Sequence, residues 1–313
     1  MAMQVDLLTT DASSQVIELA SERDWLEARR RGIGASEAAA VLGVSPYATP
    51  ISLYADKLGL VEPDEEASEA IRWGLLLQPV IVARYKQVTK RPAWDVPPYT
   101  VRRSRAHPFM LASLDALTTI EGGARIPLEV KNVGGYRAAD WREEPPLWVQ
   151  VQAQHQMAVL GSEHASVAAL IGGNQFVYCD VARNDRFVAV LIEQLGTFWD
   201  RLLMKEPPPV DGSAATKALL RTLYPKETPG LVVNLPSDAV EWDRLVAAAK
   251  ASKTTAQKVI DEYENKLKAA IGEAECGVTQ TGVAFAWKSV SVKGFTVAPR
   301  IDRRLTRKES THE

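Results

Sequence analysis

The order of apolar and polar positions divides the chain into a mixed α/β region and a mainly helical remainder. Apolar residues at helical spacing predict helices over 21–30, 36–43, 49–59, 70–89, 148–160 and 185–205. Short runs bounded by turn residues predict strands over 99–103, 109–113, 116–120, 126–130, 166–173 and 175–181. Strands interleaved with helices in this way favour a mixed central β-sheet flanked by helices.

Local signals set the helix starts. Ser21 with Asp24 resembles a capping box, Ser36 is expected to cap the second helix, and Thr49 precedes a first-turn proline. The long helix over 70–89 contains Pro79, which predicts a kink or a restart. Its expected buried stripe is Ile71, Leu75, Val82 and Tyr85.

Three consecutive prolines at 207–209 are the clearest boundary in the chain. They predict a domain over 1–206 and a C-terminal appendage over 207–313. In the appendage, an Ala- and Lys-rich stretch over 237–271 predicts a long helix or helical pair, and 282–295 predicts a β-hairpin.

Composition narrows the classes of function. The chain has 46% hydrophobic residues and a net charge of -2, so any nucleic-acid site must be a local patch. Cys179 and Cys276 form no CxxC pair, which argues against a cysteine-rich metal centre. The sequence shows no signal peptide and no apolar run long enough to span a membrane, so we expect a cytoplasmic protein.

The stretch from 111 to 133 carries the candidate chemistry. Asp115 ends one predicted strand, and Glu129 and Lys131 lie on another. Because side chains alternate along a strand, Glu129 and Lys131 share a face, and a turn can bring Asp115 beside them. Mg²⁺ prefers such carboxylate oxygens, and a nearby lysine suits phosphodiester hydrolysis. From these residues alone, a cross-strand salt bridge on a solvent-facing sheet is the favoured interpretation.

The surrounding motifs extend the interpretation. RRRGIGASEAAAVLGVSPYATPISLYADKLG, WGLLLQP, HPFMLASLDAL, LEVKN, VQAQHQMAVLG and ALIGGNQFVYCDV follow one another in this order over roughly residues 20–205. This series resembles the YqaJ-type viral recombinases, which are similar to phage lambda exonuclease and belong to the PD-(D/E)XK nuclease superfamily.

The resemblance implies an exonuclease that digests one strand of duplex DNA from 5′ to 3′ with two Mg²⁺ ions, which Mn²⁺ can replace. It implies that Asp115, Glu129 and the Val130 carbonyl bind metal, that Lys131 is the catalytic lysine, and that Gln154 touches the active site.

The resemblance also assigns Arg29, Ser36 and Ser113 to a terminal 5′-phosphate. An arginine fork and a helix N-terminus are both chemically suited to phosphate. The alternative for the arginines at 29–31 is that they complement a helix C-terminus.

One position departs from the family pattern. Gln78 stands where the group has a glutamate in its Trp-Gly-x-x-x-Glu-Pro motif. A neutral metal ligand that retains activity is the interpretation we favour. The alternatives are a slower enzyme that needs more metal and a non-cleaving protein that binds DNA ends.

The resemblance further implies phage or prophage origin and a role in recombination by single-strand annealing. The expected partners are duplex DNA ends, an annealing protein and further copies of the chain in a ring, such as a trimer. Two other functions stay open: an end-binding scaffold that recruits an annealing protein, and a structure-specific endonuclease on the same fold.

Overall fold

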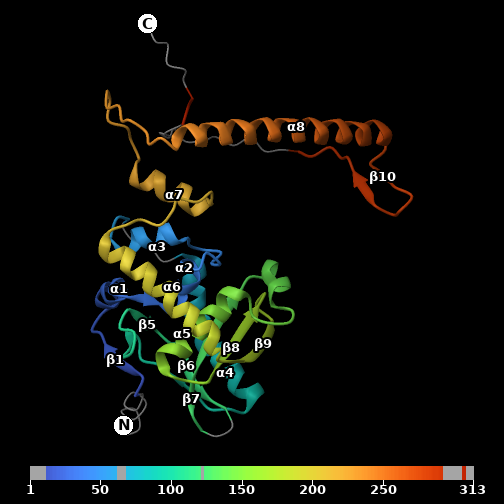
Figure 1. The fold of residues 1–313 in the computed structure, drawn as a ribbon. Coiled ribbons are helices and arrows are strands. Elements are labelled where there is room, and N and C mark those ends of the chain that lie inside the picture. Colours follow the sequence, from blue (N-terminus) through green and yellow to red (C-terminus); the bar gives the residue numbers. More distant parts are fainter. Residues whose placement is uncertain (1–11, 62–67, 121–122, 292–304, 308–313) are drawn as a thin grey trace. The chain divides into compact units, whose positions relative to one another are not determined.

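The computed structural model describes residues 12–61, 68–120, 123–291 and 305–307. The chain divides into two compact units, Met1–Pro225 and Lys226–Glu313 (Figure 1). The first unit contains the predicted α/β region and extends beyond the prolines at 207–209. The reason is helix α7 (Ala214–Leu223), which places Leu219 against Ile51 and Ala55 and so adds to the core of the first unit.

The central sheet of the first unit confirms the predicted mixed α/β class. Its strand order is β3 (Ala93–Asp95), β6 (Ala116–Thr119), β7 (Arg125–Val133), β8 (His164–Ile171) and β9 (Gln175–Ala182). β7 and β8 are parallel, and the other neighbours are antiparallel.

Helices α4 (Glu69–Thr89) and α5 (Leu147–Leu160) flank this sheet. Alternate residues of β8 divide between them, because side chains of a strand point to opposite faces. Val167 and Ala169 pack with Met157 of α5, whereas Ala168 packs with Tyr85 of α4.

A second sheet has the order β1 (Ser14–Glu18), β4 (Thr100–Ser104), β5 (Met110–Ala112) and β2 (Ile33–Gly34). Helices α2 (Ala35–Val41), α3 (Pro50–Lys57), α5 and α6 (Asp185–Met204) share a buried apolar cluster with it. Strand β1 pairs with β4 in a stretch for which the sequence predicted no strand.

Two of the three predicted helix caps are confirmed. Ser21 caps α1 (Glu22–Arg30) and Thr49 caps α3, each accepting a backbone N–H three residues on. The prediction for Ser36 is wrong, because α2 begins two residues earlier with Gly34 at its N-cap. The side chain of Glu37 accepts the Gly34 N–H at 2.7 Å and takes over the capping role.

Helix α4 departs from its predicted stripe. It continues through Pro79 without an interruption. Val82 and Tyr85 are buried as expected, but Ile71 and Leu75 are 55% and 66% exposed, so only the C-terminal half of the helix packs on the sheet. The acidic sequence over 62–69 predicts a solvated loop before this helix, and most of that range lies outside the described residues.

The second unit contains α8 (Ala239–Ile271), a single continuous helix with no buried residue, and the hairpin of β10 (Cys276–Val278) and β11 (Ala284–Ala286). A hairpin was predicted over 282–295. It forms earlier in the chain, and the predicted second strand lies mainly outside the described residues. Across the described helices, none is both long and apolar enough to cross a membrane.

Candidate active site

Asp115, Glu129 and Lys131 meet at the edge where β6 and β7 come together, as the sequence predicts. Asp115 directly precedes β6, and its Oδ2 accepts the Val130 backbone N–H at 2.8 Å. The Lys131 ammonium lies 2.5 Å from Glu129 Oε1. Strand alternation places Glu129 and Lys131 on one face, and the hydrogen bond to Val130 fixes Asp115 beside them.

Glu129 is buried, with 2% of its surface exposed, and two glutamines of α5 hold its carboxylate. Gln152 Nε2 donates to Oε1 at 2.7 Å, and Gln156 Nε2 donates to Oε2 at 2.6 Å. Gln152 also accepts a hydrogen bond from Lys131 Nζ at 3.0 Å. The amide of Gln152 therefore joins the carboxylate to the ammonium.

The family resemblance implied that Gln154 touches the active site, but in the structure its amide bonds elsewhere. Gln154 Nε2 donates to the Ala182 carbonyl at 2.8 Å, and its Oε1 accepts the Asn184 N–H at 2.9 Å. These bonds fasten α5 to the junction of β9 and α6. Gln152 and Gln156, four residues apart, instead share the helix face that lies toward β7.

The charges of the site affect one another strongly. Burial and the adjacent Glu129 charge raise the pKa of Asp115 to about 7, although Lys131 and the Val130 N–H act in the opposite direction. Burial opposes the charged form of Lys131, but Glu129 and Asp115 outweigh it, and the pKa of the ammonium is raised. The Lys131 ammonium also lies 5.3 Å from the ring centroid of Trp148.

Gln78 approaches this group from α4. Its Nε2 donates to the Asp115 backbone carbonyl at 3.0 Å, so the side chain lies beside the acidic pair, as its place in the motif implies. Its amide nitrogen is engaged with the backbone, and its Oε1 is the end that could bind a metal ion. Nowhere in the described ranges do three or more His, Cys, Asp or Glu side chains cluster as a metal site, so any cation here depends on the two carboxylates and on carbonyl oxygens.

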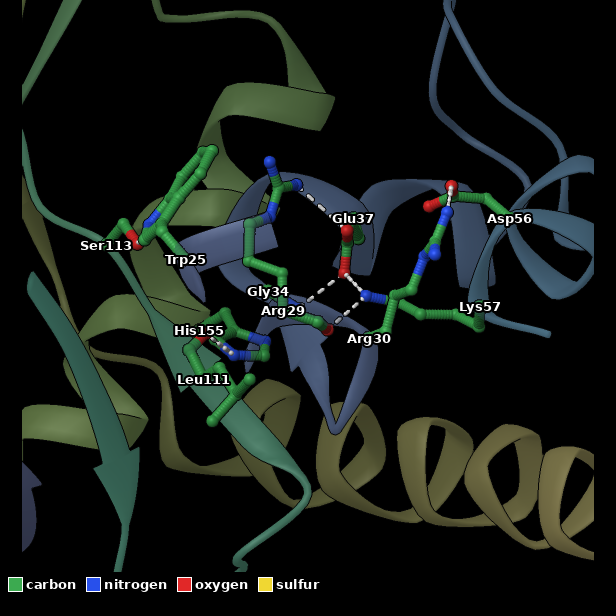
Figure 2. A network of polar contacts seen from close by, with 10 residues as sticks. All are labelled: Trp25, Arg29, Arg30, Gly34, Glu37, Asp56, Lys57, Leu111, Ser113 and His155. Carbon is green, nitrogen blue, oxygen red and sulfur yellow. Dashed lines mark hydrogen bonds and ion pairs between the residues drawn. The ribbon is translucent and has the colours of Figure 1, made fainter. Parts of the chain in front are cut away.

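A second group of charges lies around Arg29, near the C-terminus of α1 (Figure 2). Arg29 Nη2 is 2.8 Å from Glu37 Oε1, and the Lys57 ammonium is 2.6 Å from Glu37 Oε2. Lys57 Nζ also donates to the Arg29 carbonyl at 2.7 Å. The motif-based reasoning identified Arg29 but missed Glu37 and Lys57; a capping glutamate three residues after Gly34 was the available signal.

Trp25 connects Arg29 with Ser113. The guanidinium carbon of Arg29 lies 4.8 Å from the ring centroid of Trp25, and the indole Nε1 donates to Ser113 Oγ at 3.0 Å. Figure 2 shows the two side chains on either side of the indole. Ser36 lies in the first turn of α2 rather than at its cap.

One cleft of about 270 Å³ unites the two groups. The carboxylates of Asp115 and Glu129 and the ammonium of Lys131 line it together with Gln152. All three residues that the sequence assigned to phosphate also line it: Arg29, Ser36 and Ser113. Gln154 and Gln78 are not among its lining residues.

His155, which follows Gln154 in α5, has a structural contact rather than a place in the cleft. It is fully buried, and its Nε2 donates to the Leu111 carbonyl at 3.0 Å. Burial lowers its pKa to about 4, so the ring is neutral at physiological pH. It joins α5 to β5 and does not line the cleft.

Comparison with known proteins identifies the family. The YqaJ-like viral recombinase domain matches residues 24–163. The protein YqaJ of Bacillus subtilis strain 168 is 31% identical over 293 residues, which cover 91% of this chain and 86% of the relative.

Solved structures include an alkaline exonuclease from Laribacter hongkongensis, which is 20% identical with a TM-score of 0.49; the match covers 64% of this chain and 96% of that chain. A phage-related exonuclease from Haemophilus somnus 129PT is 9% identical with a TM-score of 0.39, covering 56% and 96%. The identity to YqaJ, which extends over nearly the whole chain, decides the assignment: the chain belongs to the YqaJ-like viral recombinase family.

Proposed function

We propose that the protein is a Mg²⁺-dependent exonuclease that digests one strand of linear duplex DNA from the 5′ end, for recombination by single-strand annealing. One observation carries this proposal: Asp115, Glu129 and Lys131 share a cleft with Arg29 and with Ser36 and Ser113. The cleft therefore combines carboxylates for a cation with donors for a phosphate.

The donor set suits a divalent cation. Asp115 and Glu129 are two adjacent carboxylates, and their mutual repulsion contributes to the raised pKa of Asp115. A cation beside them would favour the charged form of both. Mg²⁺ is usually bound through one or two carboxylates together with substrate phosphate, so two side chains are enough. Asp115 and Glu129 would hold the metal, with the Val130 carbonyl and Gln78 Oε1 as further ligands, and Mn²⁺ would substitute.

The protein's own groups divide the remaining work. When bound, Mg²⁺ polarises a phosphoryl oxygen and lowers the pKa of a bound water. Lys131 stabilises the negative charge that develops on the scissile phosphate. Gln152 fixes the Glu129 and Lys131 side chains relative to each other through its two hydrogen bonds. Arg29 and Ser113 bind the terminal phosphate, which fixes the position of the first phosphodiester and gives the 5′-to-3′ direction.

We infer the setting of the reaction from the resemblance to the family. We expect a phage- or prophage-encoded enzyme that works in the bacterial cytoplasm with an annealing protein, as a ring-shaped homo-oligomer such as a trimer.

The decisive experiment compares linear duplexes with 5′-phosphate ends, the same duplexes with 5′-hydroxyl ends, and closed circles, each with Mg²⁺ or with EDTA. We expect metal-dependent release of nucleotides from linear DNA only, faster with the phosphate. Lys131→Ala should abolish it, whereas Lys86→Ala, on the far half of α4, should digest DNA like the wild type. Cutting of closed circles would exclude the exonuclease and favour the endonuclease alternative.

A second candidate is an end-binding scaffold with little cleavage. The observation in its favour is that Gln78 brings no charge and uses its amide nitrogen on the Asp115 carbonyl. Under this alternative the protein binds the ends of linear duplex DNA at high Mg²⁺ or Mn²⁺ but releases no nucleotides.

A further inference from the structure

Arg29 is held at both its side chain and its main chain. Glu37 Oε1 accepts a hydrogen bond from the guanidinium Nη2 at 2.8 Å, and Lys57 Nζ donates to the Arg29 carbonyl at 2.7 Å. The same ammonium lies 2.6 Å from Glu37 Oε2, and Gly34 N–H completes the carboxylate's contacts at 2.7 Å (Figure 2). Glu37 therefore connects the end of α1 with α2 and α3.

This cluster is buried unevenly. The Lys57 side chain is 2% exposed, Glu37 is 11% exposed and Arg29 is 29% exposed. Removing three charges from water is costly unless each is well paired, which the short contacts provide. Of the three, only Arg29 lines the cleft. Two cations and one anion leave one positive charge, which reaches the cleft through Arg29.

The guanidinium retains donors for an anion. Within the described chain, Glu37 is the hydrogen-bond partner of Arg29 and engages only Nη2. An arginine fork has five N–H groups, so Nε and Nη1 can bind a phosphate while Nη2 stays on Glu37. The indole Nε1 donates to Ser113 Oγ at 3.0 Å. The hydroxyl proton of Ser113 is therefore available to a different acceptor.

We propose that Glu37, neutralised by Lys57, is a positioning residue that aims the Arg29 guanidinium at the cleft and so sets the preference for a 5′-phosphorylated DNA end. This inference rests on the proposed exonuclease function. An isolated arginine on a helix end samples many rotamers, and a fixed carboxylate removes that freedom before the DNA arrives. Glu37 touches no substrate in this scheme and acts through Arg29.

The test measures end binding without cleavage. Duplexes that differ only in a 5′-phosphate or 5′-hydroxyl are titrated in EDTA with full-length protein, and the ratio of the two Kd values is the phosphate preference. A charge-assisted hydrogen bond is worth roughly a ten- to hundredfold change in affinity. We expect Arg29→Ala to abolish the preference, Glu37→Gln to reduce it by about tenfold, and the double variant to be no worse than Arg29→Ala.

Matched controls separate positioning from folding. Glu27→Gln removes a glutamate of α1, the helix of Arg29, whose partner is the exposed Arg23, and it should leave the ratio unchanged. Thermal unfolding is followed for each variant. If Glu37→Gln does not fold, Glu37→Asp keeps the charge but is one methylene too short to reach Arg29 and Lys57 together, and it should lower the ratio.

Two outcomes would overturn the inference. A Glu37 variant that melts earlier but keeps the wild-type ratio would make the residue a structural cap only. A wild-type protein without any phosphate preference would remove the terminal-phosphate site altogether. The nuclease assay on linear DNA is separate, so metal-dependent cleavage can stand or fail independently of either outcome.

Discussion

Two glutamates, Glu37 beside Arg29 and Glu129 beside Lys131, are neutralised in different ways. Glu37 is paired with two cations, Arg29 and Lys57. Glu129 is paired with one, Lys131, and its other two side-chain donors are neutral glutamine amides. Both carboxylates are fully hydrogen-bonded, as burial requires. The two groups differ in net charge: Glu37 with its two cations is positive overall, whereas Glu129 with its one cation is neutral.

This difference distinguishes Glu37, a structural carboxylate, from Glu129, a carboxylate that can bind a cation. At Glu37 the protein supplies more positive than negative charge, so the carboxylate needs nothing further. At Glu129 the glutamines fix the position of the carboxylate without cancelling its charge, and Asp115 adds a second negative group. Neutral donors are therefore an economical way to pre-organise a metal site, because they leave the charge available for the ion.

The largest expected effect comes from removing the unbalanced charge. Asp115→Asn should lower the rate of nucleotide release by roughly 1,000-fold or more, because a metal ligand worth several kcal/mol is lost. In EDTA the same variant should be more stable than the wild type, by about 1–2 kcal/mol after allowance for the open cleft. Urea unfolding at pH 8 measures the stability, and the release of nucleotides measures the rate.

The raised pKa of Asp115 explains why Asp115→Asn should be more stable than the wild type at pH 8. The folded pKa of Asp115 is about 7, above the ordinary value of 3.8, so the folded state retains a proton that the unfolded state has lost. The wild-type protein without metal should therefore lose stability as the pH rises from about 4 to 7, and Asp115→Asn should reduce this slope. An Asp115→Asn variant that is less stable than the wild type at pH 8 would show that the carboxylate is not strained by its surroundings.

Removing a neutral donor should have the next largest effect. Gln152→Ala takes one hydrogen bond from Glu129 and one from Lys131. Loss of such a supporting contact typically costs 10- to 100-fold in activity or metal affinity, and we expect a reduction of roughly that size. Measuring the rate against Mg²⁺ concentration would show whether the loss lies in metal affinity or in the maximal rate. An unchanged rate at all Mg²⁺ concentrations would mean that Lys131 and Gln156 are enough to orient Glu129.

Adding a negative charge beside the site should strengthen Mg²⁺ binding instead of weakening it. Gln78→Glu places a third carboxylate next to Asp115, at the position where the family motif has a glutamate. We expect the Mg²⁺ concentration for half-maximal activity to fall several-fold, because each carboxylate adds Coulomb attraction for the ion. The substitution also loses the donor to the Asp115 carbonyl, so stability without metal should fall. A raised Mg²⁺ requirement would show that Gln78 serves only the backbone.

The sequence was sufficient for four of the five strands of the central sheet, all except β3, and for the grouping of Asp115 with Glu129 and Lys131. Strand alternation and turn signals are local, and they place Glu129 and Lys131 on one face whatever the rest of the chain does. The exposed half of α4 was beyond this reasoning. Ile71 and Leu75 fit a helical stripe, but a stripe predicts burial only where another element covers it.

The glutamines of α5 show a second limit. Ten of the residues of this helix are buried, so it has no polar face from which an orientation could be read. Four glutamines at alternate positions fit several orientations equally well. Only the packing of α5 against β7 and β8 selects the face with Gln152 and Gln156, and that contact is tertiary.

The smallest expected effect therefore tests the orientation of α5 most directly. Gln154 is two residues from Gln152 and equally conspicuous in the sequence, but its amide bonds to Ala182 and Asn184. Gln154→Ala should leave the rate of nucleotide release and its Mg²⁺ dependence within about twofold of the wild type, because no contact with Glu129 is lost. It should reduce the free energy of unfolding by about 1–3 kcal/mol, because two backbone groups lose their partner. A loss of activity as large as that of Gln152→Ala, with stability unchanged, would place Gln154 in the reaction and would mean that α5 presents a different face to the DNA.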